Sequence, residues 1–329
     1  EGVEASTTAT SGIETNGNNA NNTVVLKNST LNVPNGFGIY FPSSGTLTID
    51  NSTINAKTMG AQVCSGNLNV TAGSKINVSG DPVEKLEGDG AIQDGAAISI
   101  VNRAGYKGLG QIAIAGGTFT AKAGNAALKA YTWNSSTKQE SAFDNSAKTV
   151  AVSAGTFSSA VASDLCAEGY APVANADGTY SVGVPVAQIG GNVFISVQAA
   201  IDAAQTGETV KLLADAVVDD TVIVQDKGAI TLDLNGKTIS NTKEIWNEGA
   251  DKWSLISVRG NSDLTITGNG AIDALANDSY AIDLYDAASK CTIENGAFTG
   301  NISALYVFDG SLTINGGTFD IKQLSGQDD

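Results

Sequence analysis

A short phrase of apolar and polar residues recurs along the chain. Two apolar residues separated by one residue are followed by a turn of Asn, Gly or Ala and then by another apolar residue. The phrase occurs as VVLKNSTL (24–31), TLTIDNSTI (46–54), NLNVTAGSKI (67–76), QIAIAGGTF (111–119), TVAVSAGTF (149–157), LDLNGKTI (232–239), LTITGNGAI (264–272), CTIENGAF (291–298) and SLTINGGTF (311–319). This alternation predicts β-strands and excludes a helical period at these sites.

The spacing of the phrase predicts stacked coils of chain. Its second apolar residue, here called the anchor, recurs after 23 and 21 residues in the first half, and after 32, 27 and 21 residues in the second half. These anchors are Leu26, Ile49, Val70, Leu234, Ile266, Ile293 and Ile314. A period in the low twenties with variable insertions is typical of a solenoid. We expect each anchor to stack on the next, about 4.8 Å along the axis.

A second set of apolar strands precedes most anchors. These are GIYF (38–41), AQVC (61–64), AAISI (96–100), ALKAY (127–131), SLISV (254–258), AIDL (281–284) and ALYVF (304–308). With the segment after each turn they give about three faces per coil. The sequence therefore predicts an all-β fold, a right-handed parallel β-helix (solenoid), because parallel crossovers are almost always right-handed.

Breaks in the repeat predict two stacks in series. We expect a disordered linker over 1–22, a first β-helix with a C-terminal cap over 23–185, and a second β-helix over 186–329. The cap would be two short strands around a turn at Asp177–Gly178. A capping helix is predicted over 196–207, with Ser196 as its N-cap and Gly207 as its end.

The charge of the chain argues against several partners. The formal net charge is −16, with no histidine. Such a surface repels phosphate backbones and anionic lipid, so we expect no nucleic acid partner. No run of 18 apolar residues is present, so we expect no membrane span. The three cysteines are widely spaced, which predicts neither a metal clip nor a disulfide framework.

Several segments of the sequence resemble a known group of proteins. Four segments are similar to pectate-lyase-like β-helix repeats in large surface proteins of gut bacteria. They are the run VAQIGGNVFISVQAAIDAAQTGETVKLLADAVVDDTVIV, the later ITLDLNGKTIS, the preceding ADGTYSV and the repeated INGGTF. The likeness covers about 164–321 and, in weaker form, 24–160. It implies an exported or cell-surface protein that acts as an adhesin or interacts with carbohydrate.

Residues for polysaccharide cleavage are few. Hydrolases of this fold pair carboxylates with a histidine, which this chain lacks. Lyases use calcium and a basic residue, and Arg103 and Arg259 are the only arginines. We expect no cofactor, but calcium is an alternative for one acidic insertion, whose candidate ligands are Asp81, Glu84, Glu87, Asp89 and Asp94. A solvated loop is the other interpretation of this insertion.

Aromatic residues at outward strand positions suggest a surface for sugars. Alternation places Tyr285, Tyr306 and Phe308 outward, flanked by Asp286 and Asp309. Similar outward positions in the first half hold Tyr40, Tyr131 and Trp133. Such residues also ladder for stability alone or pack under a loop. Trp246 and Trp253 flank an insertion and are interpreted as loop anchors.

Three functions stay open from the sequence. The first is a non-catalytic extracellular or cell-surface protein for binding or adhesion, whose partner is a polysaccharide or a surface glycoconjugate of a host or bacterium. The second is a purely structural spacer. The third is a polysaccharide lyase, which the fold alone suggests.

Overall fold

The protein is described from a computed structural model in which two compact units follow one another. The described residues are 2–17, 21–85, 90–175, 177–276 and 279–323. Unit 1 spans Glu1–Val184 and unit 2 spans Pro185–Asp329. Both are solenoid-like and consist mainly of long, predominantly parallel β-sheets, which confirms the all-β class. Among the described residues, no helix has the length and apolar character that crossing a membrane requires.

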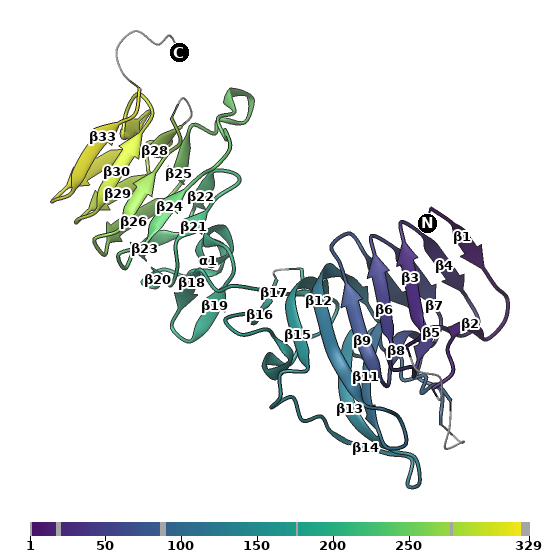
Figure 1. The fold of residues 1–329 in the computed structure, drawn as a ribbon. Coiled ribbons are helices and arrows are strands. Elements are labelled where there is room, and N and C mark those ends of the chain that lie inside the picture. The colour runs from purple at the N-terminus through teal and green to yellow at the C-terminus, as the bar shows by residue number, and fades with distance from the viewer. Residues whose placement is uncertain (1, 18–20, 86–89, 176, 277–278, 324–329) are drawn as a thin grey trace. The chain divides into compact units, whose positions relative to one another are not determined.

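Unit 1 contains two sheets (Figure 1). The strands of sheet A are β1 (Glu4–Ser6), β3 (Thr23–Lys27), β4 (Thr30–Val33), β6 (Thr46–Asp50), β7 (Thr53–Ala56), β9 (Gly66–Val70), β10 (Lys75–Val78), β12 (Leu109–Thr120), β15 (Val150–Phe157), β16 (Ala171–Ala174) and β17 (Tyr180–Gly183). Those of sheet B are β2 (Ser11–Glu14), β5 (Phe37–Phe41), β8 (Met59–Val63), β11 (Ile98–Arg103), β13 (Leu128–Asn134) and β14 (Gln139–Ala142). The chain passes repeatedly between the two sheets, so successive turns of backbone stack.

The predicted anchor column of unit 1 is confirmed by the strand register. Leu26 pairs with Ile49, Ile49 with Val70, and Val70 with Ile114. Ile49 and Ile114 are fully buried. At the turn after the anchor, Asn51 adopts a positive φ of 43° and donates a 2.9 Å hydrogen bond to the side chain of Asn28 one coil earlier. Asparagine tolerates this left-handed backbone, and the side-chain ladder reinforces the stacking.

The prediction of a disordered linker over 1–22 is wrong for the residues of the first two strands. β1 pairs in parallel with β4, and β2 pairs in parallel with β5. Their side chains are small and largely polar, so no apolar pattern marks them in the sequence. Backbone hydrogen bonds to the next coil hold them, helped by a 3.0 Å bond from Asn32 to Glu4.

Unit 1 ends in an antiparallel closure. A 3₁₀ turn at Ser163–Leu165 (η1) follows β15. β16 and β17 then pair antiparallel around a turn at Gly178, whose φ is +82°, and β17 covers the edge of β15. This closure matches the two short strands that the sequence predicts, and it pairs a sheet edge that would otherwise be open.

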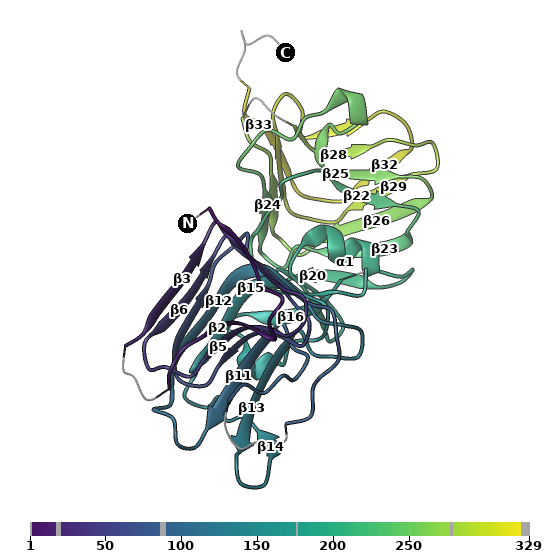
Figure 2. The same ribbon diagram turned by 90° about the vertical axis from the view of Figure 1, so that its right-hand side faces the viewer.

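Unit 2 contains three sheets, visible in Figure 2 as rows of stacked strands. The strands of sheet C are β18 (Ala187–Ile189), β19 (Asn192–Phe194), β20 (Thr209–Leu212), β23 (Gly228–Asp233), β26 (Ser262–Thr267), β29 (Lys290–Ile293) and β32 (Ser311–Ile314). Those of sheet D are β21 (Ala216–Val217), β24 (Thr238–Ser240), β27 (Ala271–Asp273), β30 (Ala297–Gly300) and β33 (Thr318–Ile321). Those of sheet E are β22 (Val222–Gln225), β25 (Ser254–Arg259), β28 (Tyr280–Leu284) and β31 (Leu305–Val307).

The register of unit 2 corrects one anchor. Ile266 pairs with Ile293 and Ile293 with Ile314, as predicted, but Ile266 pairs with Leu232 rather than Leu234. Leu234 is also fully buried, and it lies just after β23. In the run LDLNGKTI two leucines fit the apolar alternation, and the pattern alone does not decide which of them belongs to the column.

A short helix packs against the first strands of unit 2. Helix α1 spans Val197–Ala203, and Ser196 caps it by accepting a 3.1 Å hydrogen bond from the backbone N–H of Ala199. The helix ends before the predicted Gly207, which adopts a φ of +89° in the following turn. Its face of Val197, Ala200 and Ile201 is buried in the core of unit 2. A second 3₁₀ turn, η2, spans Glu248–Ala250.

Candidate functional site

The outer face of sheet B carries the three aromatic residues that the sequence places outward in unit 1. Tyr40, Tyr131 and Trp133 point away from the inner core, as the alternation predicts, but are only 4%, 3% and 5% exposed. They form a separate apolar cluster with Ile92 and Cys64. The prediction that these three residues contact a glycan conflicts with this burial, because a covered ring cannot stack on a sugar.

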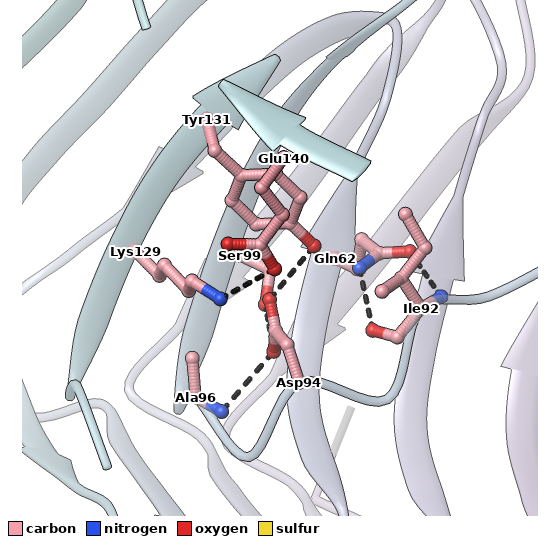
Figure 3. Close-up of polar contacts among 8 residues, drawn as sticks. All are labelled: Gln62, Ile92, Asp94, Ala96, Ser99, Lys129, Tyr131 and Glu140. Carbon is pink, nitrogen blue, oxygen red and sulfur yellow. Dashed lines mark hydrogen bonds and ion pairs between the residues drawn. The ribbon is translucent and has the colours of Figure 1, made fainter. Parts of the chain in front are cut away.

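The cover over sheet B comes from the insertion between β10 and β11, whose described residues, 81–85 and 90–95, are here called the covering segment. The Gln62 side chain donates a 2.7 Å hydrogen bond to the carbonyl oxygen of Ile92 and accepts a 2.9 Å bond from its N–H (Figure 3). The backbone N–H of Gly95 donates to the carbonyl of Thr58 over 2.8 Å. Three hydrogen bonds at two positions, Ile92 and Gly95, therefore fix the segment to the sheet, while the Ile92 side chain packs in the apolar cluster.

Asp94 is the buried charged group of the covering segment. Its carboxylate accepts hydrogen bonds from Ser99 Oγ at 2.7 Å, from the Tyr131 hydroxyl at 2.9 Å and from the backbone N–H of Ala96 at 3.2 Å (Figure 3). Burial raises the pKa of this carboxyl, against the hydrogen bonds and the nearby Lys129, which lower it. Both oxygens of this buried carboxyl are therefore engaged by donors of the protein itself.

The described residues of the acidic insertion are not gathered into the calcium site that the sequence left open as an alternative to a solvated loop. Asp94 is engaged as above, Asp81 forms a 2.6 Å ion pair with Lys122, and Glu84 lies exposed. Glu87 and Asp89 lie outside the described residues. Across the part of the chain that the structure describes, no group of three or more acidic, cysteine or histidine side chains is placed to hold a metal ion.

Arg103, one of the two candidate arginines for a lyase, is buried in unit 1. Its guanidinium donates to the carbonyl of Gly90 at 2.8 Å, to Ser135 Oγ at 3.1 Å and to the Tyr40 hydroxyl at 3.4 Å. It also lies over the ring of Tyr106, 5.1 Å from the centroid. The arginine joins the covering segment to the sheet, and its side chain is buried.

The outer face of sheet E in unit 2 differs because its aromatic residues are accessible. Tyr285 follows β28, and Tyr306 and Phe308 lie on and after β31. Phe308 is 59% exposed, and the two tyrosines are half-buried. The rings of Tyr285 and Phe308 stack with centroids 5.6 Å apart. The structure brings these three sequence-predicted residues together on one surface.

Three further aromatic residues join this surface, and the sequence interpretation missed their role. Trp253 lies 5.4 Å from Tyr285, 5.9 Å from Tyr306 and 5.7 Å from Phe308, measured between ring centroids. Trp246 lies 5.5 Å from Tyr280, which stacks on Tyr306 at 4.9 Å. We call these six residues the aromatic face: Trp246, Trp253, Tyr280, Tyr285, Tyr306 and Phe308. A signal was present, because both tryptophans lie in the one insertion that precedes an aromatic-rich pair of coils.

A hollow of about 370 Å³ opens within the aromatic face. It is lined by Trp246, Glu248, Trp253, Tyr280 and Tyr306. Glu248 comes from η2, so the insertion at residues 241–253 supplies both indole rings and the carboxylate, while the strands supply the tyrosines. The hollow is therefore amphipathic, with ring surfaces and a single acidic group.

Polar groups beneath the aromatic face hold it in place. The buried carboxylate of Asp283 accepts hydrogen bonds from Ser254 and, at 2.8 Å, from Ser257. Burial raises the pKa of Asp283. Arg259, the second candidate arginine, donates to Ser257 and to the carbonyl of Asp251, and lies 4.9 Å from the ring centroid of Tyr285. Both the carboxyl of Asp283 and the guanidinium of Arg259 are thus engaged in contacts within unit 2.

Two larger hollows lie elsewhere. One of about 530 Å³ lies in unit 2 between α1 and residues 216–223, and is lined mainly by aliphatic side chains. The other, of about 460 Å³, lies in unit 1 beside Arg103 and Tyr106, among groups that hold this arginine. The aromatic face is the stronger candidate, since it combines accessible rings with a charged group and a concave shape.

Comparison of the chain with protein-family models, with curated proteins and with solved structures finds no match. The resemblance to pectate-lyase-like repeats therefore rests on the sequence motifs alone.

Proposed function

We propose that this protein is a non-catalytic binding and adhesion module of the cell surface or extracellular space. Its partner is a polysaccharide or a surface glycoconjugate, which the aromatic face of unit 2 contacts. The proposal includes a right-handed parallel β-helix in each unit, as in the pectate-lyase-like surface proteins that the sequence resembles.

One observation carries the proposal: a cluster of aromatic rings remains open to water. Phe308 is 59% exposed, and Trp246, Trp253, Tyr285 and Tyr306 are half-buried around it. Leaving large apolar rings in water forgoes roughly 25 cal/mol per Å² of burial. Contiguous exposed apolar surface of this kind marks interaction sites in soluble proteins. Flat rings with polar neighbours suit the apolar faces of sugar rings.

Binding without turnover is favoured by the surroundings of the acidic and basic groups. The chain has no histidine, Asp283 is enclosed beneath the aromatic face, and Arg259 is held by Ser257 and Asp251. A general acid or base needs hydrogen-bond reach to the substrate. A lyase would release unsaturated products from polyuronate, and we expect none.

A structural spacer is the second candidate function, and it suits unit 1 better than unit 2. The outward aromatic residues of unit 1 are buried under the covering segment. Covered rings of this kind contribute to the stability of the stack and are not accessible to a ligand. Unit 1 would then act as a spacer that holds another domain away from the cell.

A glycan array with matched variants tests the proposal. We expect Phe308→Ala and Tyr285→Ala each to weaken binding about tenfold or more, because each removes a stacking ring. Phe319→Ala is the control, because Phe319 is 39% exposed in the same last coil but belongs to sheet D. Equal binding by all three variants and the parent would rule out this surface, and no bound glycan at all would favour the spacer.

A further inference from the structure

The hollow in the aromatic face has rings in two orientations. Tyr280 and Tyr306 stack nearly in parallel, with an interplanar angle of 19°. Trp246 stands at 73° to Tyr280, and Trp253 stands at 82° to Tyr306. Two tyrosine rings and two indoles nearly perpendicular to them therefore border one space, which Glu248 completes.

This shape differs from the platform that a sugar ring needs. A pyranose stacks on a flat ring that is open to solvent. Tyr285 and Phe308 provide such a surface, because the angle between their ring planes is only 23°. A space between perpendicular rings instead fits a compact, rounded group that contacts several rings at once. The aromatic face thus contains two kinds of contact: an open platform, and a partly open hollow between differently oriented rings, here called the box.

The charge around the box favours a cation. The faces of aromatic rings carry negative potential and attract cations within about 6 Å of the ring centroid. Glu248 adds a full negative charge, and among the described residues it forms no ion pair. Basic groups of the same insertion and of the adjoining sheet are engaged elsewhere. Lys243 pairs with Asp219, Lys252 pairs with Asp220, and Arg259 bonds to Asp251 and Ser257. The net charge of −16 adds an attractive field for cations.

We propose that the hollow lined by Trp246, Glu248, Trp253, Tyr280 and Tyr306 binds a quaternary ammonium group, such as the choline head group of a choline-bearing glycan. Cages of aromatic rings with an acidic residue suit this class of ligand, because its methyl groups contact the ring faces and its charge is diffuse. A primary ammonium is strongly hydrated and needs hydrogen-bond acceptors, of which the lining supplies one carboxylate. The inference rests on the proposed function, since it takes the aromatic face as a binding surface and names the ligand class.

The test compares choline with its uncharged carbon analogue, 3,3-dimethylbutan-1-ol, by calorimetry or ligand-observed magnetic resonance on the full chain. The two molecules share a shape and differ in charge. We expect choline to bind about tenfold or more tightly than the analogue, because the cation–π attraction at a partly desolvated site is worth this much. Equal binding of the two, or no binding of choline, would overturn the proposal.

Variants then assign the binding to the hollow. We expect Trp246→Leu to weaken choline binding about tenfold, with partial recovery in Trp246→Phe, and Glu248→Gln to weaken it about threefold. Glu244→Gln is the matched control, because it removes the same charge from an exposed position of the same insertion that does not line the hollow. Choline binding that survives Trp246→Leu and Glu248→Gln in folded protein would place any choline site elsewhere and overturn the assignment.

The two proposals fail differently. Phe308→Ala removes the open platform and leaves the box lining intact, so it should reduce glycan binding while free choline still binds. Glycan binding through Phe308 without any affinity for choline refutes the box alone. Choline binding with no glycan bound on the array refutes the glycan proposal alone. Binding to a choline-bearing glycan and binding to phosphatidylcholine vesicles are measured separately. Tighter binding to the vesicles would contradict the proposal that the choline head group belongs to a glycan.

Discussion

The outer faces of sheet B and sheet E have the same sequence pattern, but their aromatic residues differ in solvent exposure. Each carries aromatic residues at outward positions of neighbouring coils. On sheet B, Tyr131 and Trp133 are covered, while on sheet E, Tyr306 is half-buried and Phe308 exposed. The strands themselves are alike, being short and mostly parallel, and their inner side is buried except on β31, where Leu305 is half-buried and Val307 exposed. The difference therefore arises outside the strands.

The insertions cause the difference. The covering segment of unit 1 brings Ile92 and Asp94 onto the sheet, where Gln62 and Ser99 offer matching polar groups. The insertion of unit 2 instead brings two tryptophans beside the strands and leaves a hollow between them. An insertion that satisfies the polar groups of a face closes it, whereas one that adds rings at its edge enlarges the accessible surface.

The largest expected contrast is in stability. Trp133→Ala removes a buried ring and should lower the free energy of unfolding of unit 1 by about 3–5 kcal/mol. Trp246→Ala removes a half-exposed ring and should cost unit 2 about 1 kcal/mol or less. Urea denaturation followed by circular dichroism measures both. Equal losses would mean that the two faces are equally covered, and the comparison between them would not hold.

A smaller effect is expected from releasing the covering segment. Gln62→Ala leaves the N–H and the carbonyl of Ile92 without their partner and should destabilise unit 1 by about 1–3 kcal/mol. The amide of Ile92 should also exchange hydrogen faster. Gln111→Ala is the control, since Gln111 is exposed on β12. If both variants behave like the parent, the two hydrogen bonds of Gln62 are not what holds the segment to the sheet.

The smallest effect is a pH dependence that both faces should share. The pKa of Asp94 is raised above its ordinary value of 3.8 by burial, and that of Asp283 likewise. Between the unfolded and the folded pKa the native state binds the extra proton, so its stability falls as the pH rises through this range. Asp94→Asn and Asp283→Asn should each remove this component from their own unit.

The measurement is the free energy of unfolding of each variant relative to the parent, from about pH 3 to about pH 8. The unfolding free energy of the parent must be compared with that of the variant, because exposed carboxyls contribute a pH dependence of opposite sign. Hydrogen bonds lower the pKa of Asp144, Asp177 and Asp226, and their contribution is lost as the pH falls. If the parent gains stability relative to Asp94→Asn as the pH rises, the burial of this carboxyl is not what sets its pKa.

Local patterns predicted the repeated elements well, and they failed where longer-range partners decide. The alternation at Ile49 and Val70 predicted the strands and their parallel register. The first strands, β1 and β2, have almost no apolar residues, so only their pairing with the next coil reveals them. The choice of Leu232 over Leu234 likewise depends on the partner strand.

The candidate site shows the same division. Alternation placed Tyr285, Tyr306 and Phe308 outward, and their grouping followed from the coil spacing. Trp246, Trp253 and Glu248 joined them through the fold of an insertion that has no repeat to predict it.

By itself the sequence determined a solenoid-like all-β chain, because alternation of apolar residues and turn chemistry act between neighbours along the chain. Only the tertiary structure decided which outward face stays open. The hydrogen bonds between Gln62 and Ile92, and between Asp94 and Tyr131, join residues that are 30 and 37 positions apart. A buried polar group must find such a partner wherever the fold brings one, and the pattern of the strands does not record where that is.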